Sequence, residues 1–263
     1  MSSAPLMTVV WARVARRNSE RWFRWVEARK GRKPSAGFFD SYPRFLSSSD
    51  TAATVNRLNQ RYRALIDSNQ DILQGKRVLD IASHDGRWSF AARKAGASHV
   101  VGIEARQHLV QAAWRNVREY ETSDVEFVQG DVFNELDHAG PVDTVLCFGF
   151  LYHTLDHITL LRKVARLHPL HIVIDTAISV LPGSIIEVGS EKTEHESAGA
   201  VDEVGAPGMT LKGKPTKQAL ELMLTASGFR QFRYYDWRRV GIEQWSDLKD
   251  YYLGERITLR ASP

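Results

Sequence analysis

Three carboxylates follow three short apolar segments of the chain, at places where they could bind a nucleoside. Asp80 lies near the end of the first segment (residues 77–82), Glu104 ends the second, and Asp131 follows the third. A carboxylate carries two acceptor oxygens side by side, which suits the two hydroxyls of a ribose. Glu104 is therefore the candidate ribose ligand, and Asp131 is the candidate acceptor for an adenine amino group beside the apolar Val132. Taken alone, Glu104 could also be a helix cap or a solvated side chain.

The turn after the first apolar segment reads ASHDG, from Ala82 to Gly86. In a nucleotide-binding strand–turn–helix unit this turn is rich in glycine, so that the backbone can approach the ligand closely. Here only the last of the three glycine positions is a glycine, Gly86, because Ala82 and His84 occupy the other two on either side of Ser83. The turn is a weak signal by itself, and the two larger residues leave less room for a ligand.

Two further residues could move a proton. His153 comes shortly after the fourth apolar segment (residues 142–148), and Asp175 ends the fifth (residues 171–175). An imidazole titrates near neutral pH, as a general base requires, so His153 is the first candidate base. It could equally be a structural histidine bonded to backbone. Asp175 could orient His153, bind a substrate hydroxyl or ligate a cation, or it could simply cap a turn.

A divalent cation is a weaker hypothesis. Asp156, His157 and the acidic residues between 187 and 203 offer oxygen ligands of the kind that Mg²⁺ prefers. Their spacing matches no closed metal-binding loop, so no set of metal ligands can be chosen from the sequence.

Helical and strand-like patterns alternate along the chain from about residue 51 onward. Strands are expected at residues 77–82, 99–104, 125–128, 142–148 and 171–175. Helices are expected at residues 56–73, 87–95, 106–120 and 158–167. This alternation predicts an α/β fold in which helices cover both faces of a mostly parallel sheet. Ligands bind to such sheets at the carboxyl ends of the strands, which is where the candidate residues lie.

The alternation is interrupted at about residues 183–215, which are rich in Gly, Glu and Ser. An irregular insertion of this length in a compact domain is usually functional or mobile. We expect it to be a lid over a bound substrate, the alternative being a solvated loop. After it, a helix beginning near Pro215 and strands at 229–237 and 255–261 are expected to complete the sheet.

Composition excludes several classes of protein. The chain has 263 residues, of which 43% are hydrophobic and 25% are charged, as in a soluble globular domain with extensions. A chain disordered throughout, a collagen-like repeat, a coiled coil and a membrane-spanning protein do not fit. The single cysteine, Cys147, excludes an intrachain disulfide and a cysteine-rich zinc site, and it fits a cytoplasmic location.

The net charge of +4 is unevenly distributed. Residues 1–35 carry nine Lys and Arg against two Glu, a surplus of +7, so residues 36–263 carry −3. We expect residues 1–35 to form a basic helical arm in which aromatic residues alternate with arginines. Such an arm could lie on an anionic membrane surface or on an acidic partner, or it could pack on the domain with its basic face solvated. The negative charge of the remaining residues makes nucleic acid a poor partner for them.

Residues 76–180 resemble the class I S-adenosylmethionine-dependent methyltransferases. The matching segments are VLDIASHDG, VVGIEAR, VQGDVF and VDTVLCFGFLYHTLDH. The later segment PTKQALELMLTASGFRQFRYYDW is similar to the last helix and closing hairpin of that family. The resemblance implies a Rossmann-like sheet of seven strands with an antiparallel last strand, formed by residues 36–263. It also implies an acceptor-side insertion at about 183–215.

The resemblance also assigns S-adenosylmethionine as cofactor, bound over the first four strands. The residues that it implies around the cofactor are Arg61, Asp80, Ala82, Ser83, His84, Gly86, Glu104, Ala105, Asp131, Val132, Phe148 and Gly149. Of these, Asp80 and the turn after it would lie by the methionine part. Arg57 and Arg61 lie one turn apart on the helix expected before the first strand, so one of them could pair with the cofactor's carboxylate, or they could be solvated surface side chains. The candidates for catalysis remain His153 and Asp175.

The segments DIASHDGRWSFAA and FLYHT are most similar to a group of actinobacterial small-molecule and sugar O-methyltransferases. We therefore expect methyl transfer to a hydroxyl of a small molecule or carbohydrate. One alternative is an RNA methyltransferase acting on tRNA, but the Asn-Pro-Pro-aromatic motif of amino-group methyltransferases is absent after the fourth strand. Another is a cofactor-binding protein without catalytic activity, or one tethered to a membrane by the arm.

Overall fold

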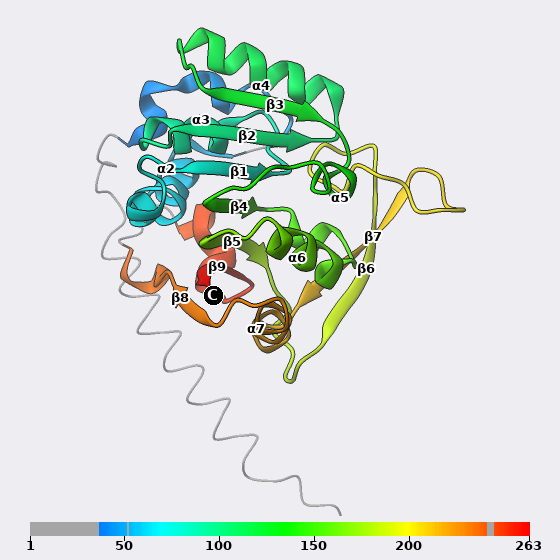
Figure 1. Cartoon of the computed structure of the whole chain (residues 1–263). Helices are drawn as coiled ribbons and strands as arrows, with labels where there is room; N and C mark the ends of the chain where they lie inside the picture. The colour runs from blue at the N-terminus through cyan, green and yellow to red at the C-terminus, as the bar shows by residue number, and fades with distance from the viewer. Residues whose placement is uncertain (1–36, 52, 241–244) are drawn as a thin grey trace, which may run out of the picture.

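The computed structural model describes residues 37–51, 53–240 and 245–263. The arm expected at residues 1–35 lies outside the described residues. Within them, a twisted sheet runs through the molecule with helices on both of its faces (Figure 1). None of the described helices combines the length and the hydropathy that a membrane span requires.

Seven strands form the main sheet, in the order β3-β2-β1-β4-β5-β9-β8. The first five are mutually parallel, β9 is antiparallel to β5, and β8 is antiparallel to β9. Their bounds are β1 (Arg77–Ile81), β2 (His99–Glu104), β3 (Val125–Gln129), β4 (Thr144–Phe148), β5 (His171–Ala177), β8 (Gln231–Tyr234) and β9 (Arg256–Ser262). The predicted α/β class and the antiparallel last strand are confirmed, with differences of a few residues at strand ends.

The helices and short 3-10 turns alternate with these strands. The α-helices are α2 (Val55–Leu65), α3 (Arg87–Lys94), α4 (Gln107–Glu119), α5 (Val132–Glu135), α6 (His157–Arg166), α7 (Lys217–Ala226) and α8 (Lys249–Tyr252). The 3-10 turns are η1 (Phe38–Ser41), η2 (Pro43–Leu46), η3 (Asp67–Ile72), η4 (Leu151–His153), η5 (Trp237–Arg239) and η6 (Trp245–Leu248).

The helix expected at residues 56–73 is divided into α2 and η3. Asn69 has a non-helical φ of −120°. Its side-chain amide donates to the carbonyls of Ala64 and Leu65, which satisfies acceptors at the end of α2. The apolar spacing continues through this break, so periodicity alone could not reveal it.

The core consists of two apolar layers, one on each face of the sheet. Val78 and Leu146 point into the layer built with α2, α3 and α4, whereas Leu79 and Val145 point into the layer built with α5, α6 and α7. All four side chains are buried. This is why the strands read as continuous apolar segments, as expected for a parallel sheet covered on both faces.

The insertion at about 183–215 is more regular than its composition suggested. It forms a separate antiparallel pair, β6 (Ile186–Lys192) and β7 (Met209–Pro215), joined by residues 193–208. This hairpin extends beyond the edge of the main sheet (yellow-green to yellow in Figure 1). β6 is largely exposed, whereas β7 has three buried positions. Both strands are interspersed with glycine and charged residues, which hides the period-two pattern of a half-buried strand.

Candidate active site

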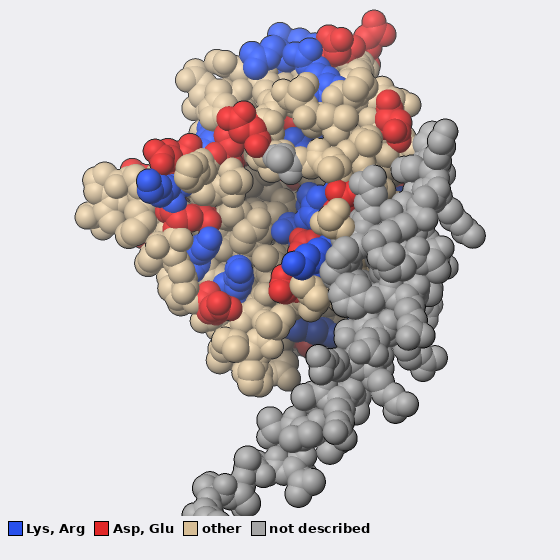
Figure 2. Space-filling model, turned by 180° about the vertical axis from the view of Figure 1, so that it is seen from behind, with Lys and Arg blue, Asp and Glu red and all other residues tan. Residues whose placement is uncertain are grey.

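A cavity of about 560 Å³ lies at the carboxyl ends of the central strands, partly covered by the segment that joins β6 to β7. Its volume is within the range of small-molecule sites. Figure 2 shows its hollow near the middle of the rear face, with acidic and basic side chains around the rim. The sequence-predicted residues that line it are Arg61, Ala82, His84, Glu104, Ala105, Asp131, Val132, Phe148, Gly149 and His153.

The turn after β1 has the backbone of a glycine loop although two of its three glycine positions are substituted. Ala82, His84 and Gly86 all have positive φ, at 53°, 55° and 77°. Only Gly86 is required by packing, because a Cβ there would lie 2.6 Å from the Phe127 ring and 2.9 Å from Ala113 Cβ. The left-handed conformation costs a residue with a side chain about 1–2 kcal/mol. The backbone of the turn therefore lies close to the cavity, and the positive φ of Ala82 and His84 lowers the stability of the fold.

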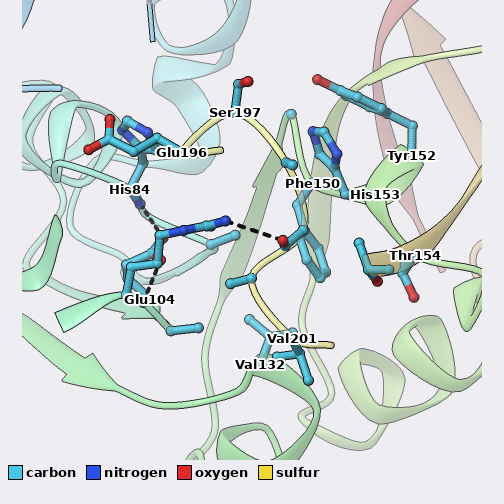
Figure 3. Close-up of a pocket in the computed structure, with 18 of the residues that line it drawn as sticks. His84, Glu104, Val132, Phe150, Tyr152, His153, Thr154, Glu196, Ser197 and Val201 are labelled. Carbon is cyan, nitrogen blue, oxygen red and sulfur yellow. Dashed lines mark hydrogen bonds between the residues drawn. The ribbon is translucent and has the colours of Figure 1, made fainter. Parts of the chain in front are cut away.

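Glu104 links the turn after β1 to the end of β2. Its Oε2 accepts a hydrogen bond from the His84 N–H at 3.0 Å, and its Oε1 accepts one from the Arg106 N–H at 2.9 Å. These bonds fix the carboxylate, which is buried but lines the cavity (Figure 3). Each oxygen has a second lone pair, so the carboxylate can still accept two hydroxyls.

Asp131 is held in a different way, as the N-cap of α5. Its Oδ1 accepts from the backbone N–H groups of Phe133 at 2.7 Å and Asn134 at 3.3 Å. The cap keeps the carboxylate at the cavity wall next to the buried Val132. A carboxylate and an apolar side chain together could accept an amino group and pack on a ring.

Three of the predicted cofactor residues, Asp80, Ser83 and Gly86, do not line the cavity. Asp80 is buried behind the turn and accepts a hydrogen bond from Ser89 Oγ at 2.6 Å. Burial raises the pKa of Asp80 to about 7. Asp80, Ser83 and Gly86 lie on the side of the turn away from the cavity, whereas Ala82 and His84 line it.

Asp175 is the centre of a buried hydrogen-bond cluster. Its carboxylate accepts from Arg61 Nη2 at 3.0 Å, Arg256 Nε at 2.7 Å, Tyr251 Oη at 2.7 Å and Thr258 Oγ1 at 2.8 Å. Burial alone would raise the pKa of Asp175, but the two arginines and the hydroxyl donors outweigh it and lower the pKa to about 2. Asp175 is fully buried and does not line the cavity, so the structure does not bring it to His153 or to a substrate.

The arginines around Asp175 give one end of the cavity a positive surplus. Arg61 and Arg256 both line the cavity and share the single charge of Asp175. The Nε of Arg61 is buried without a hydrogen-bond partner among the described residues. Arg57, which also lines the cavity, is already paired in a bidentate contact with Asp250. An anionic group of a ligand would be stabilised at this end.

His153 meets a carboxylate that the sequence did not connect with it. Its Nδ1 lies 2.5 Å from Oε1 of Glu191 on β6, so its partner is a side chain and not backbone. The ring of Tyr152 lies beside it, with ring centroids 4.0 Å apart. Glu191 was one of several acidic residues in the insertion, and no spacing signal singled it out. Its contact depends on how the β6–β7 hairpin packs on η4.

The segment that joins β6 to β7 is attached to the end of β2. Arg106 Nη2 donates to the carbonyls of Thr193 at 3.0 Å, His195 at 2.8 Å and Gly199 at 3.2 Å. Arg106 therefore lines the cavity and joins the strand end that carries Glu104 to the cover.

Glu196 forms a second attachment of the same cover. Its Oε1 lies 2.8 Å from His108 Nε2 on α4, and its Oε2 accepts from the Asp50 N–H at 2.6 Å. The segment that precedes α2 and the insertion are thus joined next to the cavity, which Thr51 and Glu196 line. That this cover acts as a lid over a bound substrate stays a prediction.

The metal hypothesis has no support from geometry in the described part of the chain, where no group of three or more His, Cys, Asp and Glu side chains could hold an ion. His157 is buried, with Nε2 at 3.0 Å from the Gly213 carbonyl and Nδ1 at 3.1 Å from that of Leu155. Burial lowers the pKa of His157 despite these bonds. Its contacts are those of a structural side chain that fixes β7 to α6.

Residues 78–168 match the methyltransferase domain family. A probable protein arginine N-methyltransferase 3 from Arabidopsis thaliana is 29% identical over 112 residues, 43% of this chain and 17% of that protein. The demethylmenaquinone methyltransferase of Lactococcus lactis subsp. lactis (strain IL1403) is 27% identical over 96 residues, 36% of this chain and 38% of that protein. The chain thus spans less than half the length of either curated relative.

Solved structures agree with this match at the level of fold. The N-terminal domain of EvdMO1, crystallised in the presence of SAH and D-fucose, has a TM-score of 0.60 and 19% identity over 80% of this chain and 83% of that one. Magnesium protoporphyrin IX methyltransferase (ChlM) from Synechocystis PCC 6803, with bound SAH, has a TM-score of 0.51 and 16% identity over 97% of this chain and 99% of that one. Residues 78–168 thus match a methyltransferase domain, and the described residues share the fold of these solved structures.

Proposed function

We propose that the chain binds S-adenosylmethionine in the cavity and transfers its methyl group to a hydroxyl of a small molecule or sugar. The observation that carries this proposal is the arrangement of two kinds of side chain in one cavity. A nucleoside-type carboxylate, Glu104, lies on one side, and a candidate base, His153, lies with Tyr152 on the other (Figure 3).

The residues of the cofactor side fit the three parts of S-adenosylmethionine. Glu104 has lone pairs left for the ribose hydroxyls, and Asp131 with Val132 suits the adenine. The positive surplus of Arg61 and Arg256 suits the carboxylate of the methionine part. When bound, the sulfonium of this cofactor supplies a methyl group with a good leaving group already attached.

The acceptor side combines apolar and hydroxyl-bearing side chains. Phe150, Tyr152 and Thr154 line it from the segment after β4, and Val201 lines it from the insertion. A mixed wall of this kind suits a ring that carries hydroxyl groups. The D-fucose present with the EvdMO1 domain supports a sugar as one member of this class.

The chemistry needs orientation and a proton acceptor. Holding the acceptor oxygen in line with the methyl group supplies much of the rate of such a displacement. His153 lines the cavity at the acceptor side, so its imidazole could take the hydroxyl proton as the oxygen attacks.

The test is methyl transfer from radiolabelled S-adenosylmethionine to a panel of sugars and phenols, with total tRNA in parallel. We expect label in a small hydroxyl acceptor, and we expect His153→Ala to lower kcat by about 10²–10⁴-fold, the usual contribution of a positioned base. The exposed His138, which does not line the cavity, provides the matched control His138→Ala.

The alternatives give different results in the same assay. Label in tRNA alone would contradict a small-molecule acceptor and favour an RNA methyltransferase. Cofactor binding without transfer to any acceptor would favour a non-catalytic binding protein. A His153→Ala variant with the wild-type kcat would remove His153 from the chemistry.

A further inference from the structure

We propose that Glu191 is a positioning residue for methyl transfer, fixing the ring orientation and tautomer of His153 and stabilising its protonated form. The proposal rests on the proposed function of His153 and deepens it. It means that the insertion supplies a part of the catalytic apparatus in addition to covering the cavity.

The contact between the two side chains is short and shielded. His153 Nδ1 and Glu191 Oε1 are 2.5 Å apart, and their side chains are only 10% and 11% exposed. A neutral imidazole has one N–H, so an Nδ1–H that donates to the carboxylate leaves Nε2 with a free lone pair. His153 would then present an acceptor nitrogen to the cavity that it lines.

Glu191 is itself held in place by two further donors. Its Oε1 accepts from the Gly199 N–H at 2.7 Å, and its Oε2 accepts from Lys212 Nζ at 3.2 Å. Burial alone would raise the pKa of Glu191, but the hydrogen bond and charge of His153 and these two donors outweigh it and lower the pKa to about 2. The carboxylate is therefore ionised throughout the neutral pH range.

Backbone packing brings the hairpin close enough for this contact. A Cβ on Gly199 would lie 3.2 Å from the carbonyl oxygen of His153 and 2.8 Å from Thr210 Cγ2. Thr210 pairs with Glu191 in the register of β6 and β7. A side chain at position 199 would therefore separate the insertion from η4, so glycine here serves the pairing of Glu191 with His153.

The surrounding charges are consistent with a proton-accepting role. Among the described residues, Lys212 on β7 pairs with Glu191 and Tyr152 on η4 packs on His153, while the Arg256 guanidinium lies 5.4 Å from the Tyr152 ring centroid. An opposite charge within about 4–6 Å favours the charged form of a histidine. Glu191 is the carboxylate in this contact, so it would stabilise the imidazolium that forms.

The step balances without a further reactant. The acceptor oxygen bonds to the methyl carbon, the carbon–sulfur bond breaks, and its electron pair returns to sulfur. The hydroxyl proton passes to Nε2 of His153, whose positive charge lies next to Glu191.

The test uses Glu191→Gln in the full chain, because glutamine keeps the shape and one acceptor oxygen but removes the charge. We expect kcat to fall about 10- to 100-fold, part of the contribution of a positioned base. The acid limb of the kcat/KM profile should move to lower pH, since the imidazolium loses its carboxylate. The Kd for S-adenosylmethionine should stay within about 2-fold. Glu187→Gln, an exposed position on the same strand, is the matched control.

A second measurement does not depend on turnover. The ¹⁵N shifts of the His153 ring should report the Nδ1–H tautomer in the wild type and a mixture of tautomers in Glu191→Ala, which removes the acceptor oxygen that glutamine keeps. Wild-type kcat and an unmoved pH profile in a folded Glu191→Gln variant would overturn the proposal, as would an unchanged tautomer in a folded Glu191→Ala variant. A wild-type protein that transfers no methyl would contradict the proposed function, while the ring shifts would still decide whether Glu191 sets the tautomer.

Discussion

Two residues of the turn after β1 have backbone conformations that glycine adopts without cost. Ala82 and His84 have φ values of 53° and 55°. Both line the cavity, and the His84 N–H donates to Glu104. The conformation is therefore retained where it forms the binding surface, although the side chains make it less stable.

Substitution of Ala82 tests this conformation directly. A β-branched side chain is strongly disfavoured at positive φ, so Ala82→Val should lower the free energy of unfolding by about 1–3 kcal/mol. Ala82→Gly should stay within about 1 kcal/mol of the wild type, because relief of strain offsets the greater freedom of glycine in the unfolded chain. Chemical denaturation measures both. Equal stability of the valine variant and the wild type would argue against a left-handed turn.

At the scale of elements, the insertion and β2 are joined across the cavity by Arg106. Its guanidinium donates to three carbonyls of the segment between β6 and β7, while its backbone N–H donates to Glu104. Removal of the side chain leaves the backbone bond intact. One substitution can therefore release the cover and leave the backbone bond to Glu104, the proposed ribose ligand, in place.

We expect Arg106→Ala to speed the release of S-adenosylmethionine about 10-fold, because charged hydrogen bonds that hold the cover are lost. Stopped-flow displacement of the bound cofactor measures this rate. Arg93→Ala is the control, since Arg93 pairs with Asp124 away from the cavity. An unchanged release rate in Arg106→Ala would show that the cover does not limit exchange.

The strands of the main sheet could be predicted from the sequence, but the hairpin β6–β7 could not. The apolar segments that became β1 to β5 could be found because a covered parallel sheet needs side chains that are buried on both faces. Glu104 and Asp131 were expected near each other because they follow neighbouring strands, and both line the same cavity. The hairpin β6–β7 could not be predicted in this way, since it pairs outside the main sheet and β6 is largely exposed. The contact of Glu191 with His153 depends on that hairpin, so it too was beyond a reading of local pattern.

At the scale of the whole molecule, Asp175 joins parts of the chain that are distant in sequence. It connects β5 to α2 through Arg61, to α8 through Tyr251 and to β9 through Arg256. The position looked suited to catalysis because it ends a central strand. The last strand of the chain, β9, pairs with β5 and supplies Arg256 and Thr258, and these contacts of Asp175 have no signal in the local sequence.

Asp175→Asn should lower the free energy of unfolding at pH 7 by about 3–5 kcal/mol, because it leaves buried arginines without their counter-charge. The folded pKa of about 2 lies below the ordinary value of 3.8. The stability from this carboxylate is therefore complete above about pH 4 and is lost as the pH falls toward 2. Denaturation at several pH values should show a weaker acid dependence in Asp175→Asn than in the wild type.

The control for this prediction is Asp71 on η3, another aspartate that pairs with an arginine of β9. Asp71 pairs with Arg260 of β9, but its side chain is 59% exposed. Asp71→Asn should therefore change stability by less than about 1 kcal/mol. If the two substitutions cost the same, the buried cluster around Asp175 does not have the role assigned to it.

The most direct test of the account is the calorimetric titration of S-adenosylmethionine into the full chain and into Glu104→Ala. We expect one site per chain, with binding weakened by about 1.5–3 kcal/mol in the variant, the value of charged hydrogen bonds lost from a buried site. A matched Glu187→Ala variant, altered on an exposed strand position outside the cavity, should bind as the wild type does. Absence of binding to the wild type, or equal affinity of the wild type and Glu104→Ala, would contradict the account.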